Sequence, residues 1–152
     1  MREIKFRGKE KIGGVWLFGS YIYTNDDKNN PFQTNPPKEK HQIMFYESND
    51  WNMGGWNYAE VRKETIGQYT GLKDKNGKEI YEGDIIRSYD SENNPVIHYI
   101  HWHNSNACYV ATMPQYPCIC SIVTKDWIEE YDKEIIGNIH DNPELIKEEK
   151  HE

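Results

Sequence analysis

The sequence predicts a mainly all-β protein, a small barrel or sandwich with one or two short helices. Three observations predict this fold class. Roughly eight to ten short runs of aromatic and β-branched residues recur along the chain, turn-forming Gly, Pro, Asn and Asp separate them, and long helical periods are missing. Aromatic residues make up 13% of the 152 residues, so the chain can build a core although only 36% of it is hydrophobic.

The first third of the chain predicts strands over residues 3–7, 15–23 and 42–47. Gly13-Gly14 marks the turn of a hairpin between the first two strands, and Gly19 is expected to interrupt the second. Residues 24–41 are rich in Asn, Asp and Pro and show no apolar period, which predicts a long loop.

The remainder predicts short strands over residues 58–63, 95–103, 107–113, 118–124 and 134–139, and a further one that begins at Ile85-Ile86. One short helix is predicted over Asp126–Tyr131 from the spacing of its apolar residues. A second is predicted at Asn142, which would cap it, with Pro143 at the first helical position.

Two tight turns are predicted near the middle of the chain. Asn76-Gly77 is a hairpin signal that requires a positive φ at Gly77. Gly83 is expected to open the next turn, with Asp84 capping it through backbone bonds, so that Tyr81 and Ile85 or Ile86 reach the core. Four closely spaced glycines (Gly67, Gly71, Gly77 and Gly83) suit repeated sharp turns rather than a phosphate-binding loop.

The aromatic residues Trp51 and Trp56, with Met53, surround Gly54-Gly55. We expect them to pack in the core or between lobes. A stacking platform for nucleic-acid bases uses the same residue types, but no basic residue lies between Asp50 and Glu60, which disfavours it.

The net charge of −7 is unevenly placed. Residues 1–76 hold 12 Lys and Arg against 10 Asp and Glu, a net of +2, whereas residues 77–152 hold 6 against 15, a net of −9. Such an acidic half is more typical of a solvated surface than of a DNA mimic, and it disfavours duplex binding. The N-terminal cations form a small basic edge: Arg2, Lys5, Arg7, Lys9 and Lys11.

The location predicted from the sequence is the cytoplasm, with no association with a membrane. No apolar run approaches the length of about 20 residues that a membrane helix needs, and the N-terminal residues lack the apolar region of a signal peptide. Cys108, Cys118 and Cys120 are an odd number of cysteines in a reducing compartment, so no structural disulfide is expected.

The sequence contains residues for three candidate chemistries. The first is zinc binding by His101 and His103, which share a strand face, with His98 on the other face and Cys108 on the next strand. The second is a Cys–His pair between Cys108 and one of these histidines. The third is a carboxylate pair drawn from Asp74, Glu79, Glu82 and Asp84. None has the spacing of a known site, so no catalytic, cofactor or metal residue is assigned and no cofactor is expected.

Three segments share the residues and the order of a known family. They are Ile4-Lys5-Phe6-Arg7-Gly8 with Val15-Trp16 and Phe18-Gly19, then the continuous run from Thr65 to Ile86, and finally Glu134–Ile139 with Asn142–Leu145. Together they resemble the YopX family of small phage and prophage proteins. The resemblance implies a β-rich fold with a barrel-like, SH3-like C-terminal half, and it carries over no catalytic residue. The chain departs from the family pattern at residues 24–41 and in its His- and Cys-bearing strands.

These observations together predict a single β domain over residues 1–146 that can divide into two lobes, 1–68 and 69–146, with a frayed charged tail over 147–152. The leading hypothesis is a non-enzymatic phage or prophage accessory protein in the bacterial host cytoplasm. It would act by binding a protein of the host or phage, or by homo-oligomerisation. The alternatives are a nucleic-acid-binding β-barrel and, last, a small metal-dependent enzyme.

Overall fold

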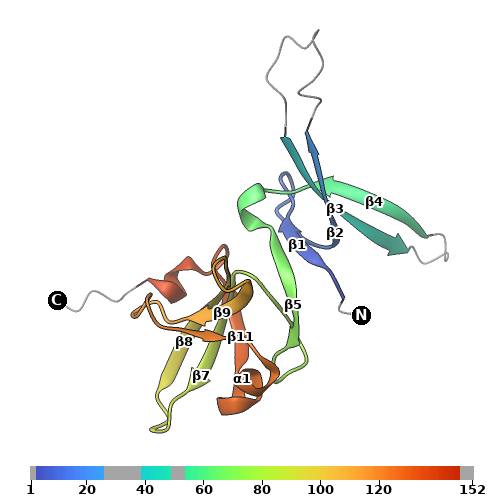
Figure 1. The fold of residues 1–152 in the computed structure, drawn as a ribbon. Coiled ribbons are helices and arrows are strands. Elements are labelled where there is room, and N and C mark those ends of the chain that lie inside the picture. Colours follow the sequence, from blue (N-terminus) through green and yellow to red (C-terminus); the bar gives the residue numbers. More distant parts are fainter. Residues whose placement is uncertain (1–2, 26–38, 49–53, 148–152) are drawn as a thin grey trace. The chain divides into compact units, whose positions relative to one another are not determined.

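The computed structural model describes residues 3–25, 39–48 and 54–147 (Figure 1). It is mostly β, with antiparallel sheets and few helices, which confirms the predicted fold class. The chain forms two compact units, one of Ile4–Gln68 and one that begins at Tyr69. Most of the loop predicted over 24–41, Trp51, Met53 and the charged tail lie outside the described residues.

The N-terminal unit is an antiparallel sheet with the strand order β4-β3-β2-β1. Its strands are β1 (Phe6–Lys9), β2 (Trp16–Asn25), β3 (Glu39–Ser48) and β4 (Gly54–Glu60), and a 3₁₀ turn, η1 (Lys63–Thr65), follows them. The predicted hairpin between the first two strands is confirmed, because β1 and β2 pair from Phe6↔Gly19 to Lys9↔Trp16. Gly67 and Gln68, the first residues of β5 (Gly67–Lys73), pair with the other edge of β1.

Gly19 does not interrupt β2, contrary to the sequence-based expectation. The strand continues to Asn25, so it also extends into the segment predicted as loop. A Cβ atom at Gly19 would lie 2.0 Å from the carbonyl oxygen of Met44. Glycine is therefore needed here because the backbone of β3 passes close to β2, which is a packing requirement rather than a turn.

One face of this sheet carries its buried hydrophobic side chains. Ile43 is fully buried, and Tyr21 and His41 lie on the same face because alternate residues of a strand share a side. The Tyr21 hydroxyl is 2.6 Å from His41 Nδ1, and the two rings stack with centroids 6.0 Å apart. Phe6 of β1 packs against Tyr21 at 5.5 Å, which extends the cluster.

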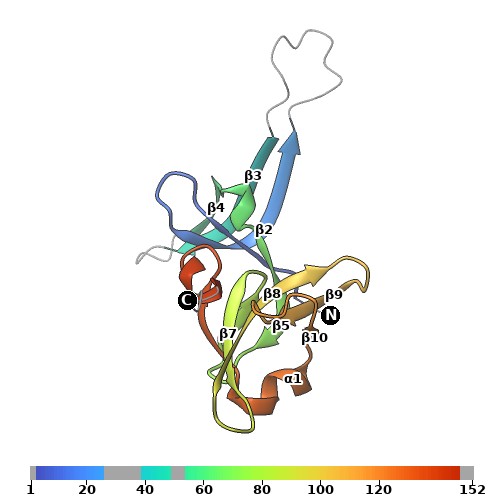
Figure 2. The same ribbon diagram turned by 90° about the vertical axis from the view of Figure 1, so that its left-hand side faces the viewer.

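The C-terminal unit is built on a five-stranded antiparallel sheet with the order β10-β9-β8-β7-β11 (Figure 2). Its strands are β7 (Asp84–Tyr89), β8 (Pro95–His103), β9 (Cys108–Thr112), β10 (Cys120–Ile122) and β11 (Glu134–Asn138). Before them, the second part of β5 pairs with β6 (Glu79–Tyr81). Four strands, β7 to β10, follow one another as a simple meander.

The core of this unit consists of Ile80, Ile86, Ile100, Ala111 and Ile128, with Leu72, Val123, Trp127 and Ile135 packed against it. Ile128 and Trp127 come from α1 (Lys125–Glu129), which the 3₁₀ turn η2 (Glu130–Asp132) follows. The predicted short helix is thus confirmed. Its N-terminus is capped by the Thr124 hydroxyl, which accepts the N–H of Trp127 at 3.1 Å.

The second predicted helix is a single 3₁₀ turn, η3 (Pro143–Ile146), with Pro143 at its start as expected. Asn142 does not cap it with its side chain, so that part of the prediction is wrong. The Asn142 Oδ1 atom instead accepts the backbone N–H of Asn138 at 3.3 Å. The amide oxygen of Asn142 thus stabilises the turn that follows β11 and does not accept the N–H groups of the 3₁₀ turn.

The two predicted turns are confirmed. Gly77 has φ +80° and Gly83 has φ +81°, and Tyr81, Ile85 and Ile86 are all buried. Asp84, itself 1% exposed, accepts the backbone N–H of Tyr81 at 2.8 Å, as the capping role predicts.

Gly67 and Gly71, in contrast, lie inside β5 rather than in sharp turns. Gly71 has φ +90° and sits where the pairing of β5 with β6 shifts register, between Tyr69↔Tyr81 and Lys73↔Glu79. Gly71 therefore forms part of a β-bulge. A bulge of this kind, like a tight turn, requires a residue with a positive φ.

Candidate interaction surface

The histidines of β8 lie on opposite faces of the strand, as the sequence predicts. His98 is 8% exposed, and its ring meets that of Trp127 edge-on with centroids 5.5 Å apart. His101 lies on the other face, where its Nε2 atom is 2.9 Å from the Thr112 hydroxyl and its ring stacks on Tyr99. These histidines therefore make structural contacts within the unit.

His98 lies in a desolvated environment with a neighbouring cation. Its Nδ1 atom is buried without a hydrogen-bond partner. Lys133 is 3% exposed, donates to the Glu130 carbonyl at 2.6 Å and places its Nζ atom 4.5 Å from the Trp127 ring. Burial, and then repulsion from Lys133, lower the pKa of His98 to about 4. The imidazole is therefore held neutral in the folded protein.

The three cysteines are free, Cys108 half-buried and Cys118 and Cys120 exposed. Cys108 is the cross-strand neighbour of His103, so the register brings together the residue types proposed for a Cys–His pair. His101, however, is hydrogen-bonded to Thr112. In the described part of the chain, no three His, Cys, Asp or Glu side chains converge as metal ligands.

The carboxylates of the 74–84 region hold turns together rather than facing one another across a cleft. Asp74 is 6% exposed and accepts three backbone N–H groups, those of Asn76 and Lys78 at 2.9 Å and that of Ile135 at 3.0 Å. Glu79 accepts the Tyr81 hydroxyl at 2.7 Å. Carboxylates engaged in this way are structural.

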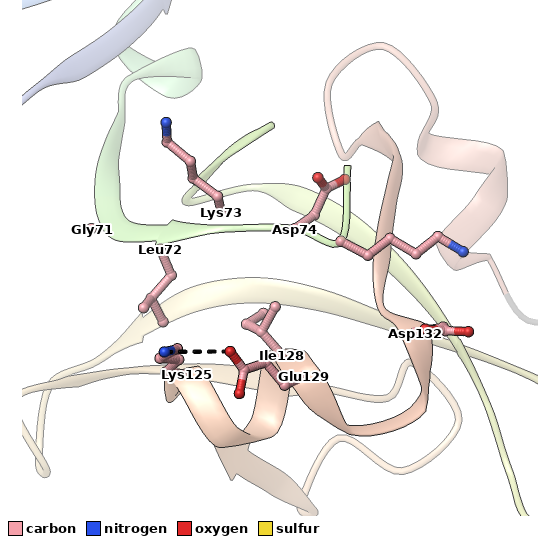
Figure 3. A pocket seen from close by; sticks show the side chains of 9 residues that line it. Gly71, Leu72, Lys73, Asp74, Lys125, Ile128, Glu129 and Asp132 are labelled. Carbon is pink, nitrogen blue, oxygen red and sulfur yellow. Dashed lines mark ion pairs between the residues drawn. The ribbon is translucent and has the colours of Figure 1, made fainter. Parts of the chain in front are cut away.

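A groove of about 520 Å³ lies between β5 and α1 in the C-terminal unit (Figure 3). Leu72 and Ile128 point toward each other across it, whereas Lys73 points away. The remaining lining side chains are charged, three of them basic and three acidic. Lys125 pairs with Glu129 at 3.5 Å, and Lys75 pairs at 3.1 Å with Glu134, which lies outside the lining. Charges that neutralise one another in this way give the groove no strong preference for either sign of ligand.

The basic N-terminal edge is partly used within the N-terminal unit. Arg7 is 7% exposed, and its guanidinium lies 4.9 Å from the ring centroid of Trp16. Lys11 forms an ion pair with Glu60. Arg2 lies outside the described residues. The cations therefore do not form an open row for phosphates.

The most exposed aromatic side chains of the N-terminal unit gather on one face of β3 and β4. Register places Tyr46 opposite Trp56 and Met44 opposite Tyr58, and opposite residues of an antiparallel pair share a face. We call Met44, Tyr46, Trp56 and Tyr58 the aromatic face. It is the side of the sheet opposite to that of Ile43 and Tyr21.

The aromatic face is both exposed and ordered by its own contacts. Tyr46 is 58% exposed, and Trp56 and Tyr58 are each 68% exposed. The rings of Tyr46 and Trp56 meet edge-on with centroids 5.5 Å apart. A Cβ atom at Gly54 would lie 2.0 Å from the Tyr46 hydroxyl. The Tyr46 side chain can therefore lie over Gly54 only because glycine has no side chain. The expected core packing of Trp56 is therefore wrong.

Charge is sparse on this side of β3 and β4. Among the described residues of β3 and β4, the charged ones that share the face are Lys40 and Glu60 at one end. The hydrogen bond from Lys11 holds the pKa of the Glu60 carboxyl below its ordinary value. The face thus offers apolar and aromatic area with few fixed charges.

Sequence reasoning missed this face because both sides of β3 carry aromatic residues. Phe45 and Tyr46 are adjacent and point to opposite sides, so alternation alone does not say which side is covered. The useful signal was Gly54-Gly55 directly before Trp56, because glycine allows a large neighbouring ring to lie over the strand.

Comparisons with known proteins bear on the family and the fold. The model of the YopX family, described as YopX protein, matches residues 5–147. The crystal structure of protein EF1440 from Enterococcus faecalis is similar, with a TM-score of 0.59 and 23% identity, over 97% of this chain and 100% of that one. Among curated proteins, none matches the chain significantly. Within the described residues, no helix is long and apolar enough to cross a membrane. The family match covers nearly the whole chain, and the protein therefore belongs to the YopX family.

Proposed function

We propose that this protein is a phage or prophage accessory protein that acts without catalysis, by binding another protein through its aromatic face. The exposure of Tyr46, Trp56 and Tyr58 on a single sheet surface is the observation that carries the proposal. The phage or prophage setting rests on the family, and we place the action in the cytoplasm of the bacterial host.

The composition of the face favours a protein partner. Tyr, Trp and Met are enriched at protein interfaces, where charged residues are depleted from the centre. Trp and Tyr also dominate the positions at which truncation to alanine costs about 2 kcal/mol or more of binding energy. The edge-on contact of Trp56 with Tyr46 restricts both rings before binding, which lowers the entropy that a partner must overcome.

Nucleic-acid binding is the main rival, because aromatic residues on a sheet can stack on bases. Such a surface needs cations beside the rings to hold the phosphates. On β3 and β4 the charged residues of this side are Lys40 and Glu60, which offset each other. On β1 the Arg7 guanidinium is buried and lies over the Trp16 ring, where it is not open to a phosphate. The charge pattern therefore favours a protein over a nucleic acid.

A catalytic role has less support than binding. His98 packs against Trp127 and His101 is hydrogen-bonded to Thr112. Asp74, Glu79 and Asp84 accept structural hydrogen bonds. We accordingly propose that the protein needs no metal and that zinc does not co-purify with it. Near-stoichiometric zinc that is lost in a His101→Ala, His103→Ala double variant would support the enzyme alternative instead.

The test is affinity capture from lysates of the bacterial host, with and without phage induction, by the parent protein and by Tyr46→Ala and Trp56→Ala variants. Tyr116→Ala is the matched control, because Tyr116 is 59% exposed but belongs to the C-terminal unit. We expect a partner that the parent and the control capture and that both face variants lose at least about tenfold.

Two results would contradict the proposal. One is a partner that binds all four proteins equally, which would place the interface elsewhere. The other is capture that nuclease treatment abolishes, which would favour the nucleic-acid alternative. Thermal melts of the variants confirm that each one folds, since all three substitutions are at exposed positions.

A further inference from the structure

The outer edge of β4 is not free to receive a partner's strand along its length. At the C-terminal end of β4 the Glu60 carbonyl accepts the Lys11 N–H at 3.0 Å, and Glu10 forms a β-bridge with Val61. A partner that added a strand to the sheet would bind mainly through such backbone groups. A segment that lies on the aromatic face binds through side chains instead, so it does not need backbone N–H groups of its own.

Register brings the side chains of the aromatic face close together. The Val61 N–H donates to the His41 carbonyl, and because hydrogen-bonded and non-hydrogen-bonded pairs alternate, Tyr46 and Trp56 form a non-hydrogen-bonded pair. The Cα atoms of such a pair are about 4.5 Å apart, and its side chains are the closer ones. The other pair of the aromatic face is of the same kind and lies two residues away, about 7 Å along the strands.

The aromatic face also carries exposed hydrogen-bond donors. These are the hydroxyls of Tyr46 and Tyr58 and the indole N–H of Trp56. Among the residues that the structure describes, none accepts a hydrogen bond from these three groups. A donor that is covered without finding an acceptor costs free energy. A partner that covers this face therefore has to supply acceptors at short intervals.

The electrostatics of the face are complementary to an uncharged segment that is rich in acceptors. Lys40 and Glu60 offset each other, and Glu60 is also paired with Lys11, so neither a cationic nor an anionic segment gains a free counter-charge from these residues. Proline supplies a carbonyl acceptor, has no N–H and carries no charge. In the polyproline II conformation the carbonyls form no internal hydrogen bonds, so they remain available to donors.

From these observations we infer that the partner presents a proline-rich segment in the polyproline II conformation to the aromatic face. The hydroxyls and the indole N–H donate to prolyl carbonyls, and the aromatic rings pack against the apolar pyrrolidine rings. Because proline fixes the conformation of the segment beforehand, little entropy is lost on binding. The inference rests on the proposed function and names the chemistry of the partner.

The test is the binding of a fluorescein-labelled peptide of ten prolines to the full chain, measured by fluorescence anisotropy. A Gly-Ser peptide of equal length is the control ligand, because it has N–H groups and no fixed conformation. We expect saturable binding of the proline peptide and at least about tenfold weaker binding of the Gly-Ser peptide, which loses more conformational entropy. Trp56→Ala is expected to weaken proline-peptide binding at least about tenfold, and Tyr116→Ala to leave it unchanged.

Tyr58→Phe tests the hydrogen bond separately from the ring. It is expected to weaken binding roughly threefold or more, whereas Tyr116→Phe in the C-terminal unit is the matched control and binds like the parent. Three results would overturn the inference: no saturable binding of the proline peptide, equal binding of the Gly-Ser peptide, or a folded Trp56→Ala variant that binds like the parent. Thermal melts establish that each variant is folded.

Competition separates this inference from the proposed function. An excess of the proline peptide is expected to release the partner that the parent protein captures. If Tyr46→Ala and Trp56→Ala lose the partner but the peptide neither binds nor competes, the proposed function stands and this inference fails. If both variants capture the partner as well as the parent does, the proposed function fails and the inference fails with it.

Discussion

Lowering the pH from 7 to 4 is expected to destabilise the protein through one buried imidazole, that of His98. Its pKa is about 4 in the folded state, because burial and the neighbouring Lys133 disfavour the charged ring, against about 6.5 for a solvated histidine. Above pH 6.5 the ring is neutral in both states. Between pH 6.5 and pH 4 the unfolded chain takes up a proton that the folded protein does not, so the free energy of unfolding falls.

The size of the effect follows from that difference in pKa. If the whole difference in pKa acted on stability, the free energy of unfolding would fall by about 3 kcal/mol at pH 4, because each pKa unit corresponds to about 1.4 kcal/mol. Solvent screening around a partly desolvated ring reduces this value, and we expect about 1–2 kcal/mol. The unpartnered Nδ1 atom adds a second expectation: His98→Leu removes a buried polar atom without a hydrogen bond and is neutral or stabilising at pH 7.

The assay is urea unfolding of the parent and of His98→Leu at several values of pH from 4 to 7.5. Carboxylates that lose stability on acidification, such as Glu134, are common to both proteins, so the difference between the two curves isolates His98. We expect this difference to grow in favour of the variant as the pH falls from 6.5 to 4. Parallel curves, or a His98 ring signal that titrates near pH 6.5 by NMR, would refute the reasoning.

Three further predictions concern turns and caps. Gly77→Val is expected to cost at least about 1 kcal/mol because a side chain is strained at φ +80°. Gly83→Val is expected to cost more, because the Cβ position is already 3.4 Å from Ile139 and the two methyl groups of valine need further room; equal melting of both variants and the parent would contradict this. Asp74→Ala is expected to cost at least about 2 kcal/mol in chemical denaturation, since three backbone N–H groups lose their acceptor, and a loss below the error of the method would argue against that role. Thr124→Ala is expected to cost about 1 kcal/mol, whereas Thr124→Ser retains the cap on the Trp127 N–H and serves as the control; a similar loss in both would point to the methyl group instead.

The turn chemistry of the C-terminal unit was the most predictable part of the fold. The strand predicted over residues 95–103 coincides with β8, and the Asn76-Gly77 and Gly83 turns form as expected. These features depend on a few adjacent residues whose backbone preferences are strong. Local chemistry is sufficient to place them.

Two glycines whose roles differ from the prediction, Gly19 and Gly71, are required by residues that are distant in the sequence. Gly19 was expected to interrupt a strand, but it allows the Met44 carbonyl of β3 to approach. Gly71 was expected in a sharp turn, but it forms a bulge whose position depends on the pairing with β6. A single sequence shows that glycine is present without showing whether a turn or a neighbouring strand requires it.

The candidate surface could be predicted in part. Alternation along β3 and β4 places Tyr46, Trp56 and Tyr58 on one side, and it places His98 and His101 on opposite sides of β8. Alternation does not tell which side of a sheet is covered, because that depends on the other segments that pack on it. For this reason Trp56 was expected in the core and is instead exposed.

The place of β11 in the chain has a consequence for the synthesis of the protein. Strand β11 is the last of the sheet to leave the ribosome, yet it pairs with β7, the first strand of that sheet, and supplies the Ile135 N–H that Asp74 accepts. During translation the edge of β7 and one carboxylate oxygen of Asp74 therefore have no partner from β11 until residues 134–138 have been synthesised. By then the strands of the N-terminal unit are already complete. A message truncated before codon 134 would yield a C-terminal unit with an open edge on β7, which is a substrate for aggregation or proteolysis.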